Sequence, residues 1–444
     1  MPTDTLSSFT GEKAWTIFLQ NVSMSQSLQF LDLFAGAGGL SEGFIQAGFE
    51  PVAHVEKDEA ACLTLQTRMT WHWLRKRDEQ DPYIHYLEGK IERQSFYSFA
   101  PSSVSNSVIH STIGDDTLRN IFSRIDVQLG DRKLDLIVGG PPCQAYSLVG
   151  RSRHAKGMRG DPRNYLFRYY AEFLNRYKPR YFVFENVLGL LSARDESGVL
   201  YFDMMRKLFR EYGYETEYQI LSAENHGVLQ GRKRIILIGK HGLGKDFYPE
   251  IPVVPSQFTV HEAFRDLPFL RAGEGDVRRA ERSPLPLDAW LYKAEIRKDS
   301  LPLTWHCARP HAERDLAIYQ QAVSLWNKEK KRLTYNELPQ SLQTHRNRES
   351  FLDRFKVVAD NLPCSHTVVA HIAKDGHYYI HPDIRQNRSL TPREAARLQS
   401  FPDDYYFEGR KDTPSRTAAF TQIGNAVPVL LAKTIATTMK EKCL

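Results

Sequence analysis

The stretch Phe30-Leu-Asp-Leu-Phe-Ala-Gly-Ala-Gly-Gly39 joins a short apolar run to a glycine-rich turn. Three further apolar runs follow, at residues 134–138, 181–184 and 235–238. Because these runs are continuous and do not alternate with polar residues, they are typical of strands buried on both faces, as in a parallel sheet covered by helices. Helix-length stretches such as 165–177 and 201–212 lie between them. This order predicts an α/β fold with a doubly wound sheet.

Three chemically distinctive segments come directly after predicted strands. The turn Phe34-Ala-Gly-Ala-Gly-Gly39 ends the first strand, Gly139-Gly-Pro-Pro-Cys143 the second and Glu185-Asn-Val187 the third. The carboxyl ends of parallel strands meet at one edge of a sheet, where ligands bind. We therefore expect the turn, the cysteine and the carboxylate to line one cleft.

The glycine turn favours a nucleoside ligand. Glycine permits a tight turn with close backbone approach, and Glu56, 18 residues beyond Gly38, could accept hydrogen bonds from a ribose. Ser41 stands where the dinucleotide fingerprint has its third glycine, which disfavours a nicotinamide or flavin enzyme. A turn selected only for helix packing is the alternative interpretation.

Cys143 is a candidate nucleophile. Two prolines precede it, fixing the backbone and removing two hydrogen-bond donors, which indicates that the next side chain must be held in place. A helix N-terminus or a nearby arginine could lower the thiol pKa and supply thiolate, the nucleophilic form. A buried structural cysteine is the alternative.

Composition places the chain among folded proteins that meet their partners in solution. Of 444 residues 41% are hydrophobic and 25% charged, enough to bury a sizeable core. The five cysteines are odd in number and form no C-x-x-C pair, which argues against a zinc site and a disulfide framework and favours a reducing cytoplasm. We expect no bound metal, no membrane span and no signal peptide.

Taken together, the motifs resemble those of the DNA (cytosine-5) methyltransferases of bacterial restriction-modification systems. Six motifs stand in that family's order: Phe34-Ala-Gly-Ala-Gly-Gly39, Gly140-Pro-Pro-Cys-Gln144, Glu185-Asn-Val187, Gln230-Gly-Arg-Lys-Arg234, Arg388-Ser-Leu-Thr-Pro-Arg-Glu394 with Leu398-Gln-Ser-Phe-Pro402, and Gln422-Ile-Gly-Asn-Ala-Val427. The resemblance implies a Rossmann-like methyltransferase sheet with a smaller target-recognition domain inserted in it.

The resemblance also implies a catalytic set. In the family a thiolate adds to carbon 6 of a flipped-out cytosine, because carbon 5 alone is too poor a nucleophile, and Cys143 matches that thiolate. Glu185 matches the acid at ring nitrogen 3, and Arg234 the contact to the base carbonyl. Arg232 alternates with Arg234 and would hold a phosphate or the surroundings of Cys143. The alternative for Glu185 is an ordinary salt bridge at the end of a strand. The alternative for Arg232 and Arg234 is an ordinary basic strand end.

S-adenosyl-L-methionine is the cofactor that the resemblance implies. The matching residues are Phe34, Gly36, Gly38, Leu40, Glu56, Asp115, Asn425 and Val427. Two departures from the family pattern bear on these assignments. Between Glu56 and Asp115 the chain is longer than a compact βαβ step needs, and Asp116 replaces the usual aliphatic residue. Leu229 replaces the usual proline before the arginine motif.

Double-stranded DNA is the implied substrate. Residues 271–356 hold 17 Lys or Arg against 12 Asp or Glu, so +5 of the chain's net +6 lies in the expected recognition domain. The predicted DNA contacts are Gln144, Ser147, Arg151 and Arg153 on the loop that closes over the base, Arg346 and Arg348 as base readers, and Arg393 on the DNA backbone or in organising the recognition domain.

The expected organisation has five parts. These are an extension (1–27), a catalytic and cofactor-binding domain (28–247), a target-recognition domain (248–387), an organising hinge (388–404) and a C-terminal return (405–444). We expect a monomer that acts beside a cognate restriction endonuclease. An RNA cytosine methyltransferase of the same fold and a non-catalytic DNA-binding relative remain alternatives.

Overall fold

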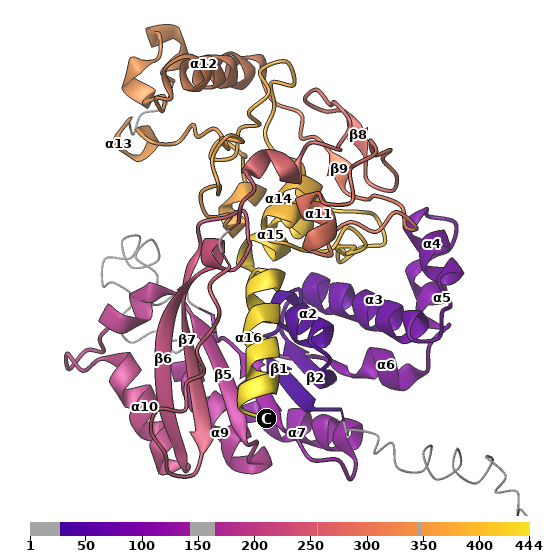
Figure 1. The fold of residues 1–444 in the computed structure, drawn as a ribbon, viewed down its shortest axis with the longest axis vertical. Coiled ribbons are helices and arrows are strands. Elements are labelled where there is room, and N and C mark those ends of the chain that lie inside the picture. The colour runs from indigo at the N-terminus through magenta and orange to yellow at the C-terminus, as the bar shows by residue number, and fades with distance from the viewer. Residues whose placement is uncertain (1–26, 143–164, 255, 345–347) are drawn as a thin grey trace, which may run out of the picture.

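A seven-stranded sheet forms the centre of the larger lobe (Figure 1). The computed structural model describes residues 27–142, 165–254, 256–344 and 348–444, without the side chains of residues 348 and 350. The strands are β1 (Gln29–Leu33), β2 (Glu50–Glu56), β3 (Val108–His110), β4 (Leu136–Gly139), β5 (Tyr181–Asn186), β6 (Tyr214–Ser222) and β7 (Lys233–His241), in the spatial order β3-β2-β1-β4-β5-β7-β6. This order confirms the predicted doubly wound α/β fold.

One strand departs from the predicted parallel arrangement. Strands β1 to β5 pair in parallel, whereas β7 lies antiparallel between β5 and β6. The run 235–238 of β7 is fully buried, as the sequence predicts, but burial on both faces does not encode the direction of a strand. Strands β2, β3 and β6 lack a comparable run, and β6 is a half-exposed edge strand.

Helices cover both faces of the sheet. On one face lie α7 (Asp115–Leu129), α9 (Leu166–Tyr177) and α10 (Tyr201–Glu211), and on the other α2 (Gly39–Gln46) and α16 (Val429–Lys442) (Figure 1). The last helix packs on α2 and shares a core with Phe30, which confirms the predicted return of the C-terminus to the sheet. Among the described residues, every helix is too short or too polar to cross a lipid bilayer.

The long connection between β2 and β3 folds into four helices. These are α3 (Glu59–Arg75), α4 (Asp81–Leu87), α5 (Arg93–Tyr97) and α6 (Ser102–Asn106). Tyr86 donates a hydrogen bond to Glu408 at 2.5 Å, Arg93 contacts the same carboxylate at 3.4 Å, and Arg278 donates to the carbonyl oxygen of Tyr86 at 2.9 Å. This insertion therefore joins the sheet lobe to both the recognition segment and the C-terminal segment.

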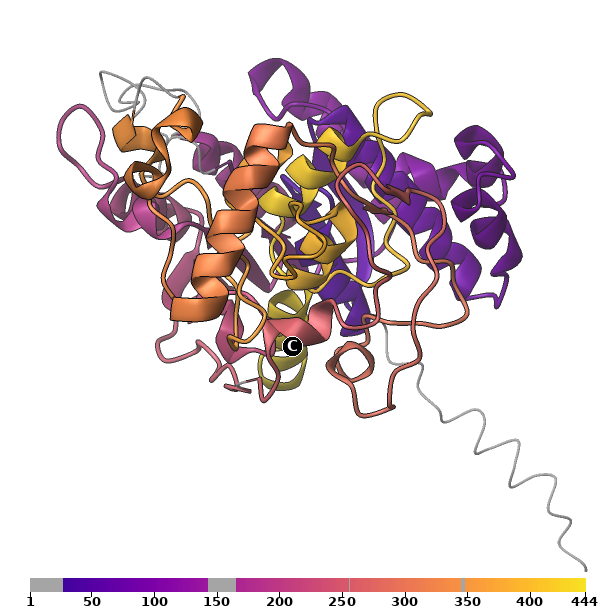
Figure 2. The same cartoon turned by 90° about the horizontal axis from the view of Figure 1, so that it is seen from above.

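The smaller lobe stands above the carboxyl ends of the parallel strands. It contains β8 (Gly275–Asp276), β9 (His306–Cys307), α11 (Trp290–Lys293), α12 (Glu313–Glu329) and α13 (Arg348–Phe351). Helix α12 has its own small core, which includes Tyr319, Leu333 and Phe355. Seen from above, α12 and the insertion helices α4 and α5 lie on opposite sides of this lobe (Figure 2).

Helix α14 (Pro392–Leu398) and the residues around it form the junction of the lobes. Thr391 caps the helix: its hydroxyl accepts a hydrogen bond from the Glu394 N–H at 3.2 Å, and the Glu394 carboxylate accepts one from the Thr391 N–H at 2.7 Å. Together these two hydrogen bonds form a capping box. Arg397 on the same helix bridges the buried carboxylates of Asp266 and Asp403. Buried charge pairs thus join α14 to residue 266 of the inserted segment and to residue 403 just after the helix.

Candidate active site

The ends of β1, β4 and β5 bring the predicted segments together. A Cβ atom on Gly139 would lie 2.1 Å from the carbonyl oxygen of Leu33, and one on Gly140 would lie 2.3 Å from that of Glu185. Only glycine fits between these strand ends. The Asn186 amide also donates to the carbonyl oxygen of Pro141 at 3.2 Å. The chain leading to position 143 is therefore packed directly against Glu185.

Cys143 itself lies outside the described residues, as do Gln144, Ser147, Arg151, Arg153 and Arg346. Arg348 begins α13, but its side chain is not described. The roles predicted for these seven residues therefore stay predictions.

Glu185 and Arg234 form an ion pair at the carboxyl end of β5, which is called the rim below. Arg234 Nε lies 2.6 Å from Glu185 Oε1, and the two side chains are 12% and 15% exposed, respectively. Glu185 pairs with Ile236 across the antiparallel strands, which places Arg234 two residues along on the same side. The predicted acid and the predicted base-contacting arginine therefore meet, beside Gly140. A partly exposed pair can still be reached by a ligand.

Arg232 has different surroundings. Its side chain is 2% exposed and donates to the carbonyl oxygens of Val368 at 2.7 Å and Gly424 at 3.4 Å. These contacts connect the arginine motif to the recognition segment and to α15 (Arg416–Asn425). They favour a positioning role over the predicted catalytic one.

The glycine turn is held by Glu56. Oε2 of Glu56 accepts the Gly36 N–H at 2.8 Å, and Oε1 accepts the Lys57 and Asp58 N–H groups, each at 2.8 Å. A carboxylate has about four acceptor positions, so about one remains for a ribose hydroxyl. At Gly36, with φ +55°, a Cβ would meet no atom within 4 Å, so the turn opens toward free space.

The back of the turn is closed by the C-terminal segment. A Cβ on Gly39 would lie 2.4 Å from the carbonyl oxygen of Val427, and one on Gly38 would lie 2.9 Å from the Tyr405 hydroxyl. Leu40 and Val427 are buried in one core. Residues from both ends of the chain therefore form this wall.

The other predicted cofactor residues lie around the same strand ends. Phe34 follows β1 with φ +59° and is half-buried. Asp115 is exposed at the start of α7, where burial and a hydrogen bond to Asp115 raise the pKa of Tyr169. Asn425 is exposed at the end of α15.

Asp32 is a candidate site residue that was not predicted from the sequence. It lies in β1 just before the turn, is 1% exposed, and neither carboxylate oxygen has a hydrogen-bond partner among the described residues. Burial, and then the nearby charge of Glu56, raise the pKa of Asp32 well above its ordinary value. Such an orphaned carboxyl beside an open turn fits a ligand with a cationic group. A lone carboxylate inside the apolar run 30–34 is the sequence signal that could have revealed it.

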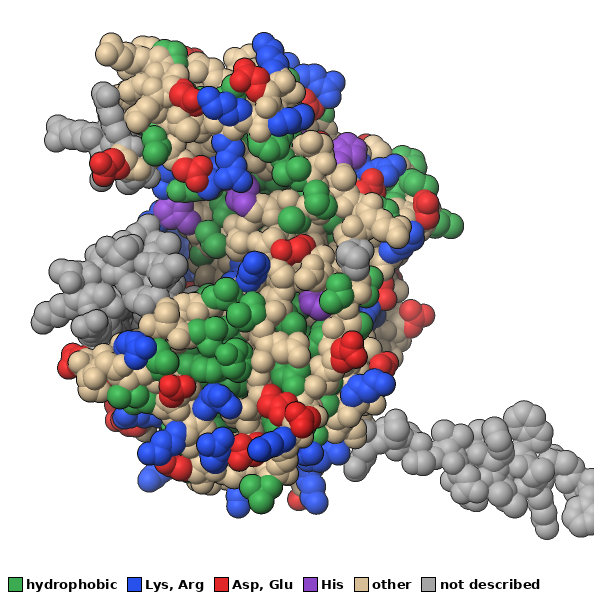
Figure 3. All heavy atoms as spheres, turned by 60° about the vertical axis from the view of Figure 1, so that its left-hand side comes forward, with side chains coloured by type: hydrophobic (Ala, Val, Ile, Leu, Met, Phe, Trp, Pro, Cys, Tyr) green, Lys and Arg blue, Asp and Glu red, His purple; other side chains and the backbone are tan. Residues whose placement is uncertain are grey.

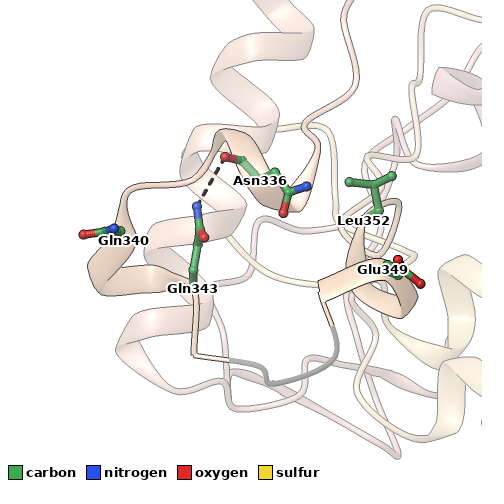
Figure 4. A pocket seen from close by; sticks show the side chains of 5 residues that line it. All are labelled: Asn336, Gln340, Gln343, Glu349 and Leu352. Atoms are coloured by element: carbon green, nitrogen blue, oxygen red, sulfur yellow. Dashed lines mark hydrogen bonds between the residues drawn. The ribbon is translucent and has the colours of Figure 1, made fainter.

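The smaller lobe contains a pocket of about 490 Å³ (Figure 4). Its lining is Asn336, Gln340, Gln343, Glu349 and Leu352. Gln343 Nε2 donates to the carbonyl oxygens of Asn336 at 3.3 Å and Leu338 at 2.7 Å, which orients its Oε1 away from those carbonyls. Side-chain amides are suited to reading base edges.

The role predicted for Arg393 must be corrected. The predicted contact to the DNA backbone is wrong for this position, because the side chain is fully buried. Its guanidinium donates to Thr304 O and Oγ1, to Pro402 O and to Tyr405 O at 2.9–3.1 Å. The contacts match the other role that the sequence left open, which is to organise the recognition domain.

The fold and the site together define a Rossmann-like enzyme. Its Glu185–Arg234 ion pair and its glycine-rich turn lie at the carboxyl ends of the parallel strands. Residues 28–92 and 105–441 match the model of the C-5 cytosine-specific DNA methylases. The chain therefore belongs to this family and is a DNA (cytosine-5) methyltransferase, as the motifs predicted.

Curated relatives are similar in sequence to this chain over almost its whole length. Type II methyltransferase M.Bpa9945I of Bacillus paralicheniformis is 41% identical, over 93% of this chain and 98% of its own length. Type II methyltransferase M.DdeI of Desulfomicrobium norvegicum is 32% identical, over 92% and 88%. A solved structure described as a DNA modification methyltransferase encoded within an E. coli prophage has TM-score 0.59 at 21% identity, over 94% of this chain and 99% of its own, and supports the fold.

Proposed function

We propose that this enzyme methylates carbon 5 of one cytosine within a short sequence of double-stranded DNA, using S-adenosyl-L-methionine and a transient bond from Cys143 to carbon 6. The Glu185–Arg234 pair beside the Gly139–Pro142 segment carries the proposal, because it supplies an acid and a cation where the chain enters position 143. The type II relatives support a modification enzyme with a cognate restriction endonuclease.

The residues of the rim divide the chemistry among them. The Cys143 thiolate forms the C6–S bond, and the electron pair displaced from the ring is met at nitrogen 3 by a proton or hydrogen bond from the Glu185 carboxyl. Arg234 holds the base carbonyl oxygen and orients Glu185. After carbon 5 is methylated its proton leaves to a base, the C6–S bond breaks and the thiolate is restored.

The glycine turn is proposed as the cofactor site. The cofactor supplies an electrophilic methyl group on a sulfonium sulfur. Glu56 offers its remaining acceptor position to the ribose, and the open side of Gly36 admits the ligand. The orphaned Asp32 carboxyl balances positive charge, and Val427 closes the wall behind the turn.

DNA is proposed to bind between the lobes. A space-filling view shows the molecule hollowed between the recognition lobe and the sheet lobe, with Lys and Arg side chains on the overhanging lobe (Figure 3). A stacked cytosine cannot be reached by a thiolate, so the target base must leave the duplex. The amides of Asn336, Gln340 and Gln343 are proposed as base readers beside Arg346 and Arg348.

Bisulfite sequencing of DNA from cells that express the protein tests the proposal. We expect protected cytosines at one position of one short motif with the wild-type chain, and none with Cys143→Ser. Cys364→Ser is the matched control, because that half-buried cysteine lies by Gly231 and has no proposed role. Duplex DNA carrying 5-fluorocytosine should form a covalent adduct with the wild type only. Unmethylated DNA and no adduct with the wild-type chain would refute the proposal.

A further inference from the structure

Two buried glutamines lie where the parts of the active site meet. Gln230 opens the arginine motif that leads to Arg234, and Gln399 follows α14. Both side chains are 0% exposed. Gln230 Nε2 donates to Gln399 Oε1 at 3.1 Å, so the two amides form a direct pair. Neither residue has a role predicted from the sequence.

All four N–H groups and both oxygens of the two amides take part in hydrogen bonds. The second N–H of Gln230 goes to the carbonyl oxygen of Leu398 at 3.0 Å, and its Oε1 accepts the Val368 N–H at 2.8 Å. Gln399 Nε2 donates to the carbonyl oxygens of Ile423 at 2.8 Å and Ala426 at 3.4 Å. A fully satisfied buried network fixes one geometry, because any displacement leaves a polar group unpaired.

Three segments with different tasks converge on this pair. Gln230 lies four residues before Arg234, which is paired with Glu185. Ala426 directly precedes Val427, whose carbonyl oxygen closes the wall behind Gly39. Val368 belongs to the recognition segment, which also binds the arginine motif through the Ser365 carbonyl oxygen.

We propose that Gln230 and Gln399 are positioning residues for methyl transfer. The amide pair sets the distance between the base side of the site, carried by the arginine motif, and the cofactor side, carried by the end of α15. Neither glutamine touches the reacting atoms. This inference rests on the proposed function, since it assigns the two sides of the site to base and cofactor. A misplacement of about 1 Å between reacting groups costs about 100-fold in rate.

The test measures the single-turnover rate of methyl transfer at saturating DNA and cofactor. We expect Gln230→Leu and Gln399→Leu each to lower this rate at least about tenfold. The rate of the double variant should be at least about one third of the rate of the slower single variant, because the pair acts as one unit. Rate losses that multiply in the double variant would overturn the proposal.

Gln422→Leu is the matched control. Gln422 lies on α15, is 5% exposed, accepts from Thr64 Oγ1 at 2.6 Å and donates to the carbonyl oxygen of Glu408 at 2.8 Å. This variant also loses buried hydrogen bonds but leaves the amide pair intact. We expect a comparable fall in melting temperature with a rate within about threefold of wild type. An equal rate loss in Gln422→Leu would show a general structural effect and refute the inference.

Thr367→Val decides the question if the leucine variants do not fold. Thr367 Oγ1 donates to the carbonyl oxygen of Gly231 at 2.5 Å and is half-buried, so its removal is milder. We expect a rate loss of about tenfold with an unchanged melting temperature, whereas a rate within about threefold of wild type refutes the inference. Wild-type protein that fails to methylate duplex DNA contradicts the proposed function instead.

Discussion

At the scale of the residue, the Glu185–Arg234 pair is the most direct point of intervention. Glu185→Gln keeps the shape of the side chain but removes the proton that the carboxyl can deliver and the charge that faces Arg234. We expect kcat to fall by about 100- to 10,000-fold, the range of general acid catalysis, while the Kd for DNA stays within about threefold.

The control for that variant is Glu215→Gln. Glu215 pairs with Arg210 on the surface, at 3.1 Å, far along the sheet from the rim. It should leave kcat unchanged, because exposed pairs contribute little. A Glu185→Gln enzyme with the wild-type kcat would show that the Glu185 carboxyl takes no part in the reaction.

His306 makes folding sensitive to acid. Burial lowers its pKa to about 4, from the ordinary value of 6.5. Its ring bonds Thr391 Oγ1 and the carbonyl oxygen of Pro268, and charged Glu394, Arg388 and Arg397 lie near it. Between pH 6.5 and 4 the unfolded chain binds more protons than the folded one, so stability is complete above pH 6.5 and is lost as the pH falls.

We expect His306 to account for about 2 kcal/mol of the loss in unfolding free energy between pH 7 and pH 5. Urea unfolding of wild type and His306→Gln at the two pH values measures it. The variant should show a pH dependence smaller by that amount. An identical pH dependence in the two proteins would mean that His306 is not held neutral.

At the scale of the element, the turn that begins α2 depends on its contact with the C-terminal segment. Gly39→Ala places a Cβ 2.4 Å from the carbonyl oxygen of Val427, which is backbone and cannot swing aside. We expect the Kd for S-adenosyl-L-methionine to rise about tenfold or more, as calorimetry would show. Gly244→Ala, where the nearest atom is the Lys240 Nζ at 3.8 Å, should bind normally. Normal binding by Gly39→Ala would place the cofactor elsewhere.

Hydrogen bonds from the buried Arg393 hold helix α14 in position. Arg393→Ala leaves the buried carbonyl oxygens of Thr304 and Tyr405 without their donor and removes one of the two donors to the Pro402 carbonyl oxygen. We expect the free energy of unfolding to fall by about 3 kcal/mol, with an unchanged salt dependence of DNA binding in protein that remains folded. A stable variant with a weaker salt dependence would restore the DNA-contact role.

The sequence predicted elements where local pattern and burial coincide. The run 181–184, the capping box at Thr391 and the return of α16 all follow from such patterns. The direction of β7, the burial of Arg393 and the Gln230–Gln399 pair could not be predicted in this way. Each depends on contacts between segments far apart in the chain, which composition and periodicity do not record.

At the scale of the whole molecule, charge should steer DNA to the smaller lobe. Lys330 and Arg332 are exposed beside α12, and each phosphate contact contributes about −0.9 to the slope of log K against log salt. We expect Lys330→Gln with Arg332→Gln to reduce that slope by about 2 without changing the methylated motif.

The matched pair is Lys240→Gln with Lys245→Gln, near the end of β7 that lies opposite the rim. It removes the same charge and should leave the slope unchanged. Filter binding over a range of salt concentrations measures both. Equal slopes for the two double variants would mean that the smaller lobe contributes no phosphate contacts at its α12 face.

The packing of α16 against α2 and β1 has a consequence for how the protein is made. The first strand and the last helix share one core, and Val427 closes a wall begun at Gly39. A ribosome delivers these parts hundreds of residues apart, at about 5–20 residues per second, so the N-terminal half must wait with its apolar face uncovered. Newly made enzyme therefore becomes competent only once α16 has emerged and packed, and a chain cut short before Val427 lacks the wall behind Gly39.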